Sequence, residues 1–162
     1  MKRLFFTSLY LCLILFPVYS AKYVGAKKCK LCHNSAKHGK AYDTLYKTKH
    51  SKAFEGLVED GKADDPYCIV CHSTGFNEGG YKMGASDSYN NDFKGVQCEE
   101  CHGPGSDYIK NEIMKNRKKA VLNGLKIPNE KLCIKCHDKK KYPWAKSFIY
   151  KDRIKKIDHT YR

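Results

Sequence analysis

The chain has 162 residues, of which 41% are hydrophobic, and it carries a formal net charge of +14 at pH 7. This length is that of one domain rather than of an array of domains. Its 31 lysines and arginines are scattered along the sequence instead of forming one basic stripe, which argues against nucleic-acid binding despite the charge.

The N-terminus has the pattern of an export signal. Lys2 and Arg3 precede an almost wholly apolar segment, 4–16, and Val18 and Ser20 are the small residues expected before a cleavage site. We therefore expect a cleaved signal peptide at 1–20, one mature domain at 21–162 and a periplasmic location. Spanning a bilayer takes about 20 apolar residues, so an uncleaved anchor is the weaker alternative. No transmembrane segment is expected in the mature chain.

One pattern, Cys-x-x-Cys-His, occurs four times and uses every cysteine of the mature chain. The cysteines are Cys29, Cys32, Cys68, Cys71, Cys98, Cys101, Cys133 and Cys136. The histidines that follow the pairs are His33, His72, His102 and His137.

Three chemistries use paired cysteines. Disulfides within the pairs would close only small loops, and Cys₄ zinc sites would leave the histidines without a role. Covalent attachment of haem c uses all three residues, because positions i, i+3 and i+4 lie on one face of a helical turn. The thiols then bond to the two vinyl groups of the porphyrin, and the imidazole ligates the iron. We predict four covalently bound haem c groups, with zinc and disulfides as the alternatives.

Between the motifs, three segments have the 3.6-residue hydrophobic period of helices: 41–57, 108–122 and 147–157. His50 lies on the apolar stripe of the first, and Gly124 is a plausible stop for the second. The segment 75–97, rich in Gly, Ser and Asn, is predicted to be a loop.

The predicted fold is mainly α with extensive loops. The motifs begin 39, 30 and 35 residues apart, which is too little chain per haem to build an ordinary apolar core. We therefore expect a small multihaem cytochrome c whose core is formed by four stacked haems.

Three histidines remain to ligate the distal sides of four irons: His38, His50 and His159. His50 is the best candidate and His159 the second. His38 follows His33 by five residues and is expected to be too close to reach the far face of the same haem. Met114 is a further candidate, and His/Met ligation would raise the reduction potential.

The excess of lysine has two interpretations. Each haem brings two propionates, and part of the positive charge is expected to solvate or pair with them. The rest is expected to form a docking surface for an acidic redox partner, whose binding would weaken with salt.

The segment CIVCHSTGFNEGGYKMGASDSYNNDFKGVQCEECHGPG, 68–105, resembles the corresponding part of the tetrahaem cytochrome c-554 family. The stretches GAKKC, KHSKAFEGL and the terminal HTY are similar to that family as well. The resemblance implies a mainly helical fold with closely stacked haems. It also implies electron transfer from hydroxylamine oxidation towards membrane-bound, quinone-linked carriers.

Carried over by position, the resemblance implies that His50 is the distal ligand of the haem at His137. It implies that His159 ligates the haem at His102, and that the haem at His72 is five-coordinate with an open side. The predicted function is electron transfer between redox proteins. The alternative is reduction of nitric oxide or a similar small ligand at the open haem.

The chain departs from the family at the first haem. The family's distal ligand there is a histidine on the helix after CHGPG, and the stretch SDYIKNEIMKNRKKAV, 106–121, contains none. Met114 or His38 would replace it, or this haem would be open too.

Overall fold

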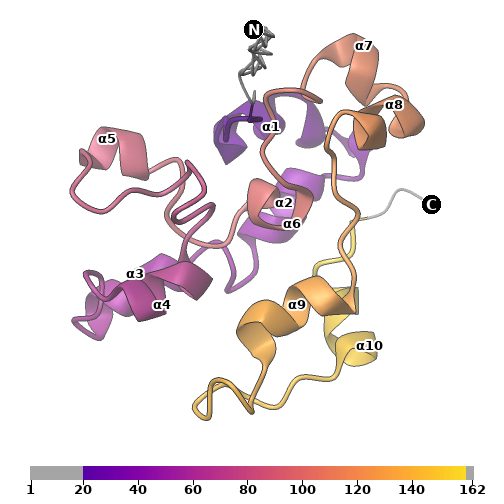
Figure 1. Ribbon diagram of the computed structural model, residues 1–162. Helices are drawn as coiled ribbons and strands as arrows, with labels where there is room; N and C mark the ends of the chain where they lie inside the picture. Colours follow the sequence, from indigo (N-terminus) through magenta and orange to yellow (C-terminus); the bar gives the residue numbers. More distant parts are fainter. Residues whose placement is uncertain (1–19, 160–162) are drawn as a thin grey trace, which may run out of the picture.

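A computed structural model describes residues 20–159 (Figure 1). Apart from Ser20, the predicted signal peptide lies outside the described residues, so its cleavage stays a prediction. Within residues 20–159, no helix is both long and apolar enough to cross a bilayer.

The described part of the chain consists of short helices joined by long loops. The helices are α1 (Ala26–His33), η1 (Ala36–His38), α2 (Ala41–Tyr46), α3 (Ala53–Glu59), α4 (Pro66–His72), α5 (Asp87–Asn90), α6 (Cys98–His102), α7 (Asn111–Met114), α8 (Arg117–Leu122), α9 (Glu130–His137), α10 (Tyr150–Arg153) and η2 (Ile154–Lys156). The described residues contain no strand, only an isolated bridge between Ser73 and Lys94. The prediction of a mainly α fold with extensive loops is confirmed.

The predicted helix 41–57 is two helices, α2 and α3, separated by a turn at 47–52. Hydroxyl groups explain the interruption. Thr48 Oγ1 donates to the Leu45 carbonyl at 2.7 Å, and Ser51 Oγ donates to the Tyr46 carbonyl at 3.1 Å. Because these side chains take the carbonyls that a continuing helix would use, the helix ends. His50 therefore lies in the turn and not on a helix.

The other two predicted helices are also divided. Asn116 ends the first part of 108–122 and caps α8, since its side chain accepts a hydrogen bond from the Lys119 N–H. Gly124, with φ 98°, follows the end of α8 as predicted. The third segment forms α10 and η2, and the predicted loop 75–97 contains the single-turn helix α5.

An apolar cluster holds α3 and α4 against the 75–97 loop. Phe54, Leu57, Ile69, Tyr81 and Phe93 form it, and each is at most 8% exposed. The two helices lie side by side (Figure 1). This packing fixes the C-terminal end of α4, where a motif histidine stands, against the start of α3.

Glu99 joins the segment before α1 to α6. Its side chain is 1% exposed, and its carboxylate accepts backbone hydrogen bonds from Val24 at 2.9 Å, Gly25 at 2.7 Å and Gly105 at 2.7 Å. Burial raises the pKa of Glu99, and the three N–H groups oppose that rise. The first and third motif helices, which are in contact, are thus held together by one carboxylate.

We predict that Glu99→Ala lowers the free energy of unfolding by about 2–4 kcal/mol, because buried N–H groups lose their acceptor. Guanidinium denaturation of the holoprotein measures the change. The control is Glu112→Ala, in the first turn of α7, where the exposed side chain should contribute about 0.5 kcal/mol or less. Equal effects of the two substitutions would contradict the role of Glu99.

Candidate functional site

Each of the four Cys-x-x-Cys-His motifs lies in a short helix whose last residue is the motif histidine. The helices are α1, α4, α6 and α9. All eight motif thiols are free in the described residues. In each helix the two thiols and the imidazole occupy positions i, i+3 and i+4, so they project from one face. This arrangement is the one needed to bind a single edge of a porphyrin and its iron.

Local sequence sets where these helices begin and end. Asp65 caps α4 by accepting a hydrogen bond from the Tyr67 N–H at 2.9 Å, and Pro66 occupies the first helical position. After α6, Gly103 adopts φ 77°, which turns the chain away from the motif. The Tyr108 hydroxyl donates to the Gly103 carbonyl at 2.6 Å and holds this turn in place.

Backbone carbonyls orient two of the motif imidazoles. Nδ1 of His72 lies 2.7 Å from the carbonyl oxygen of Ala53, and Nδ1 of His102 lies 3.0 Å from that of Lys126. A carbonyl accepts only, so Nδ1 carries the proton and Nε2 keeps its lone pair. Such outer hydrogen bonds are the usual supports of metal-binding histidines.

Burial favours the neutral form of four imidazoles. Desolvation is the largest cause of the lowered pKa of His33, His50, His102 and His137. The charge of a nearby histidine lowers the pKa further in two cases. His38 acts on His33, and His137 acts on His50. A neutral imidazole is the form that binds metal, so these groups suit ligation at neutral pH.

Three pairs of imidazoles face each other at nearly the same separation. The ring centroids are 5.9 Å apart for His50 and His137, 5.8 Å for His102 and His159, and 5.8 Å for His33 and His38. A metal–imidazole bond is about 2 Å long, so two imidazoles on opposite sides of one metal ion have centroids about 6 Å apart. All three pairs have the spacing that a shared metal ion requires.

The sequence spacing predicts that His38 is too close to reach the far face of the haem at His33, yet the His38 ring faces the His33 ring. The chain does not continue as a helix after His33. Ser35 is extended, residues 36–38 form η1, and Gly39 has φ 66°. This change of direction returns the His38 ring towards His33, which the sequence spacing alone did not suggest.

His72 differs from the other motif histidines, because no described imidazole is paired with its ring. Met114, the other candidate for the first motif, stands at the C-terminal end of α7. Among the described residues, the ring that faces His33 is that of His38.

Thiols of different motifs meet in two places. The Cys29 and Cys98 thiols interact, and this hydrogen bond is the main cause that raises the pKa of Cys29 and lowers that of Cys98. The Cys71 and Cys136 thiols interact in the same way, which lowers the pKa of Cys71 to about 7. The first motif therefore adjoins the third, and the second adjoins the fourth.

The third motif also lies near the fourth and the second. Burial is the main cause that raises the pKa of Cys101 to about 12, and the Cys133 thiol contributes electrostatically, so the third and fourth motifs are close to each other. Glu100, in the third motif, accepts a hydrogen bond at 2.8 Å from the N–H of Gly75, just after the second motif.

Two further features were not visible in the sequence. The Phe148 ring stacks on His137 with centroids 4.6 Å apart, and the carbonyls of Ala53 and Lys126 orient His72 and His102. A backbone carbonyl leaves no sequence signal, and Phe148 lies in a segment with no motif.

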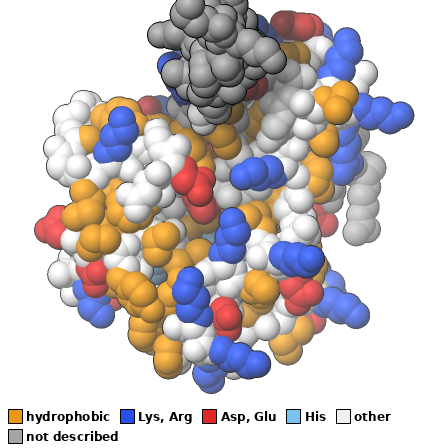
Figure 2. All heavy atoms as spheres, in the orientation of Figure 1, with side chains coloured by type: hydrophobic (Ala, Val, Ile, Leu, Met, Phe, Trp, Pro, Cys, Tyr) orange, Lys and Arg blue, Asp and Glu red, His pale blue; other side chains and the backbone are white. Residues whose placement is uncertain are grey.

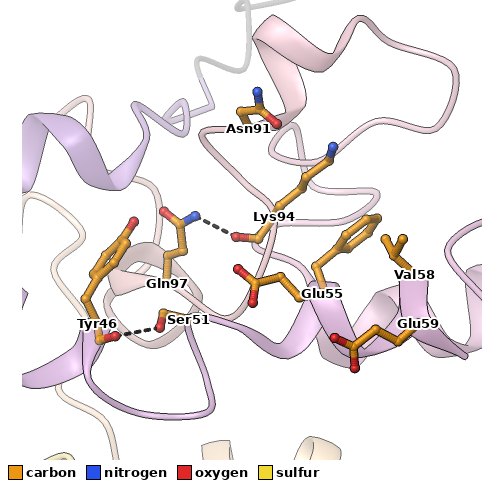
Figure 3. A pocket seen from close by; sticks show the side chains of 9 residues that line it. Tyr46, Ser51, Glu55, Val58, Glu59, Asn91, Lys94 and Gln97 are labelled. Carbon is orange, nitrogen blue, oxygen red and sulfur yellow. Dashed lines mark hydrogen bonds between the residues drawn. The ribbon is translucent and has the colours of Figure 1, made fainter.

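A separate pocket of about 560 Å³ opens between α3 and the end of the 75–97 loop (Figure 3). Glu55, Glu59, Lys94 and Gln97 line it together with Tyr46, Ser51, Phe54, Val58 and Asn91. The lining contains no cysteine or histidine, so the thiols and the ring pairs lie outside this pocket.

Within residues 20–159, no three His, Cys, Asp or Glu side chains are grouped as a metal site made by protein alone would need. The eight free thiols and the facing imidazoles fit haem c, since the porphyrin supplies the other four ligands of its iron.

Comparison with known proteins agrees with the fit to haem c. The family model described as cytochrome c554 and c-prime matches residues 28–103, which contain the first three motifs. Cytochrome c-554 of Nitrosomonas europaea is 31% identical over an alignment of 129 residues, which covers 73% of this chain and 53% of that protein. The chain thus spans about half the length of the curated relative it matches.

The fold is similar to a solved structure as well. Reduced cytochrome c554 from Nitrosomonas europaea matches with a TM-score of 0.59 and 26% sequence identity, over 89% of this chain and 80% of that one. The family match, the curated relative and the shared fold together show that the chain belongs to the cytochrome c554 family, whose cofactor is covalently bound haem c.

Proposed function

We propose that the protein is a tetrahaem electron carrier of the periplasm. When bound, each haem supplies an iron that accepts and releases one electron. The observation that supports this function best is the contact between the first and third motif helices, α1 and α6, which Glu99 joins by hydrogen bonds, because haems attached to neighbouring helices would lie close together. Four attachment points this close allow electron transfer within the protein without any catalytic acid or base.

Each haem is held by one motif: two cysteines attach it, and the histidine that follows them binds the iron. The distal ligands are His50 for the haem at His137 and His159 for the haem at His102. The ring separations of 5.9 and 5.8 Å support these assignments. They also agree with the pairing that the family resemblance implies. The haem at His72 has an open distal side.

The neighbouring motifs suggest a path for electrons. The first motif helix contacts the third, and Glu100 of the third motif accepts a hydrogen bond from Gly75, just after the second. Electrons therefore pass between the haems of neighbouring motifs, and the open haem at His72 is one of them.

We predict that the mature protein has the mass of the chain plus four haems, and that its oxidised form contains at least one high-spin iron, at His72. His50→Ala removes one distal imidazole, so one further iron should become high-spin in electron paramagnetic resonance. Lys49→Ala, at the exposed neighbouring position, is the control and should leave the spectrum unchanged. A mass equal to that of the bare chain, or of the chain plus zinc, would overturn the proposal.

The partners are a redox protein that donates electrons and another that accepts them. The resemblance suggests a donor linked to hydroxylamine or nitrogen-oxide metabolism and a quinone-linked membrane cytochrome as acceptor. Charge supports an acidic docking surface on at least one partner. Loss of Lys2 and Arg3 with the signal peptide lowers the net charge only from +14 to +12, and lysines and arginines are spread over the face shown in Figure 2.

We predict that this positive charge accelerates reaction with anionic redox partners. Ferricyanide, an anionic oxidant, stands in for an acidic protein. Its second-order rate constant with the reduced protein should fall as salt rises, because screening shortens the range of the attraction from about 30 Å at 0.01 M to about 3 Å at 1 M. A neutral quinone is the control and should react at a rate independent of salt. If ferricyanide behaves like the quinone, the docking charge has no role.

A second candidate function is reduction of nitric oxide or a similar small nitrogen oxide. The observation that favours it is His72, whose ring no described imidazole faces. The overall reaction joins two nitric oxide molecules, two electrons and two protons into nitrous oxide and water. Steady-state consumption of nitric oxide by the reduced holoprotein tests this function. If the gas binds without turnover, the protein is a carrier only.

A further inference from the structure

The ring pair at His33 and His38 has the same dimensions as the two pairs already assigned. Its centroid separation is 5.8 Å, against 5.9 Å for His50 and His137 and 5.8 Å for His102 and His159. The angle between its ring planes is 56°, and those of the other pairs are 75° and 65°. The His33 and His38 rings therefore leave the same space for a metal ion between them as the rings of the other two pairs do.

The turn that carries His38 is closed by its own hydrogen bonds. The backbone N–H groups of His38 and Lys40 both donate to the Ser35 carbonyl, at 3.0 and 3.1 Å, and the Gly39 N–H donates to the Ala36 carbonyl at 3.1 Å. Gly39 has φ 66°, a value that suits glycine. The position of His38 therefore follows from a defined turn and not from an extended loop.

Ser35 also orients the His38 ring. Its Oγ lies 2.9 Å from Nδ1 of His38, and its hydroxyl donates to the Cys32 carbonyl at 3.4 Å. In the tautomer in which Nδ1 of His38 carries the proton, Oγ accepts a hydrogen bond from Nδ1–H while its own hydrogen is directed to Cys32. Nε2 of His38 then keeps its lone pair. The hydrogen bonds from Nδ1 to backbone carbonyls have the same effect for His72 and His102.

We propose that His38 is the distal axial ligand of the haem attached at Cys29 and Cys32, opposite His33. This inference rests on the proposed tetrahaem function and completes its ligand set. It differs from the pattern implied by the family resemblance, in which a histidine after CHGPG takes this role. The segment 106–121 has no histidine, and the nearby η1 turn supplies one instead.

The assignment has two consequences for the first haem. Both of its axial ligands and both of its attachment cysteines come from residues 29–38, so its ligation does not depend on α7 or α8. Two imidazoles also favour a lower reduction potential than an imidazole with a methionine. The haem at the first motif is therefore of low potential.

His38→Ala tests the assignment in the holoprotein. We expect one iron per protein to change from low-spin to high-spin in the oxidised form, and the number of carbon monoxide molecules bound by the reduced form to rise by one. Added imidazole should restore the low-spin signal. His38→Met should keep the iron low-spin, gain the charge-transfer band of methionine-ligated ferric haem and raise one reduction potential.

Two control variants separate the alternatives. Lys37→Ala changes the exposed neighbour of His38 within η1 and should leave spin states and carbon monoxide binding unchanged. Met114→Leu should also leave spin states and carbon monoxide binding unchanged. If Met114→Leu creates the new high-spin iron and His38→Ala does not, methionine is the ligand and the proposal is overturned.

Haem content distinguishes this proposal from the one on which it rests. Fewer than four haems by mass in the unmodified protein would overturn the tetrahaem function itself. Four haems together with an unchanged spectrum of His38→Ala would overturn only the ligand assignment. The spectra are compared at equal haem content, so partial loss of folded protein does not imitate either result.

Discussion

The structure depends on a local geometric constraint: two thiols and one imidazole project from a single face of a short helix. In the haem c attachment that this pattern indicates, thioether bonds from the two thiols would fix a porphyrin to that face, and the imidazole would bind its iron. Each motif helix ends at its histidine, so the chain is free to leave the haem at once. Helices of this kind need little apolar packing of their own, which explains why so few residues form an ordinary core.

The contacts between motifs organise the rest. Glu99 ties the chain before α1 to α6, and the Cys29 and Cys98 thiols meet in the same region. The packing of α3 on α4 brings the Ala53 carbonyl to His72. Structural contacts thus lie directly beside the motif cysteines and histidines. We therefore expect a change in one of these contacts to alter the position of a proposed haem ligand.

Local hydrogen bonding explains where sequence periodicity failed. The apolar period of 41–57 continues through Lys47–Lys52, yet Thr48 and Ser51 take the backbone carbonyls and end the helix. Asn116 divides the next segment by capping α8. Ser35 and Gly39 fold η1 back towards His33 in the same manner. In each case a short polar side chain or a glycine outweighed a pattern that spans many residues.

The sequence by itself determined the cofactor class, because the spacing of Cys-x-x-Cys-His is a local property that any helical turn converts into one binding face. It also determined the helical fold class and made His50 and His159 the leading distal candidates. The family resemblance implied the pairing of His50 with His137 and of His159 with His102, and the facing rings agree with it. Only the tertiary structure decided that the His38 ring faces His33. The arrangement of the histidine rings depends on turns and on side-chain hydrogen bonds. A sequence pattern does not show in which direction a turn sends the chain.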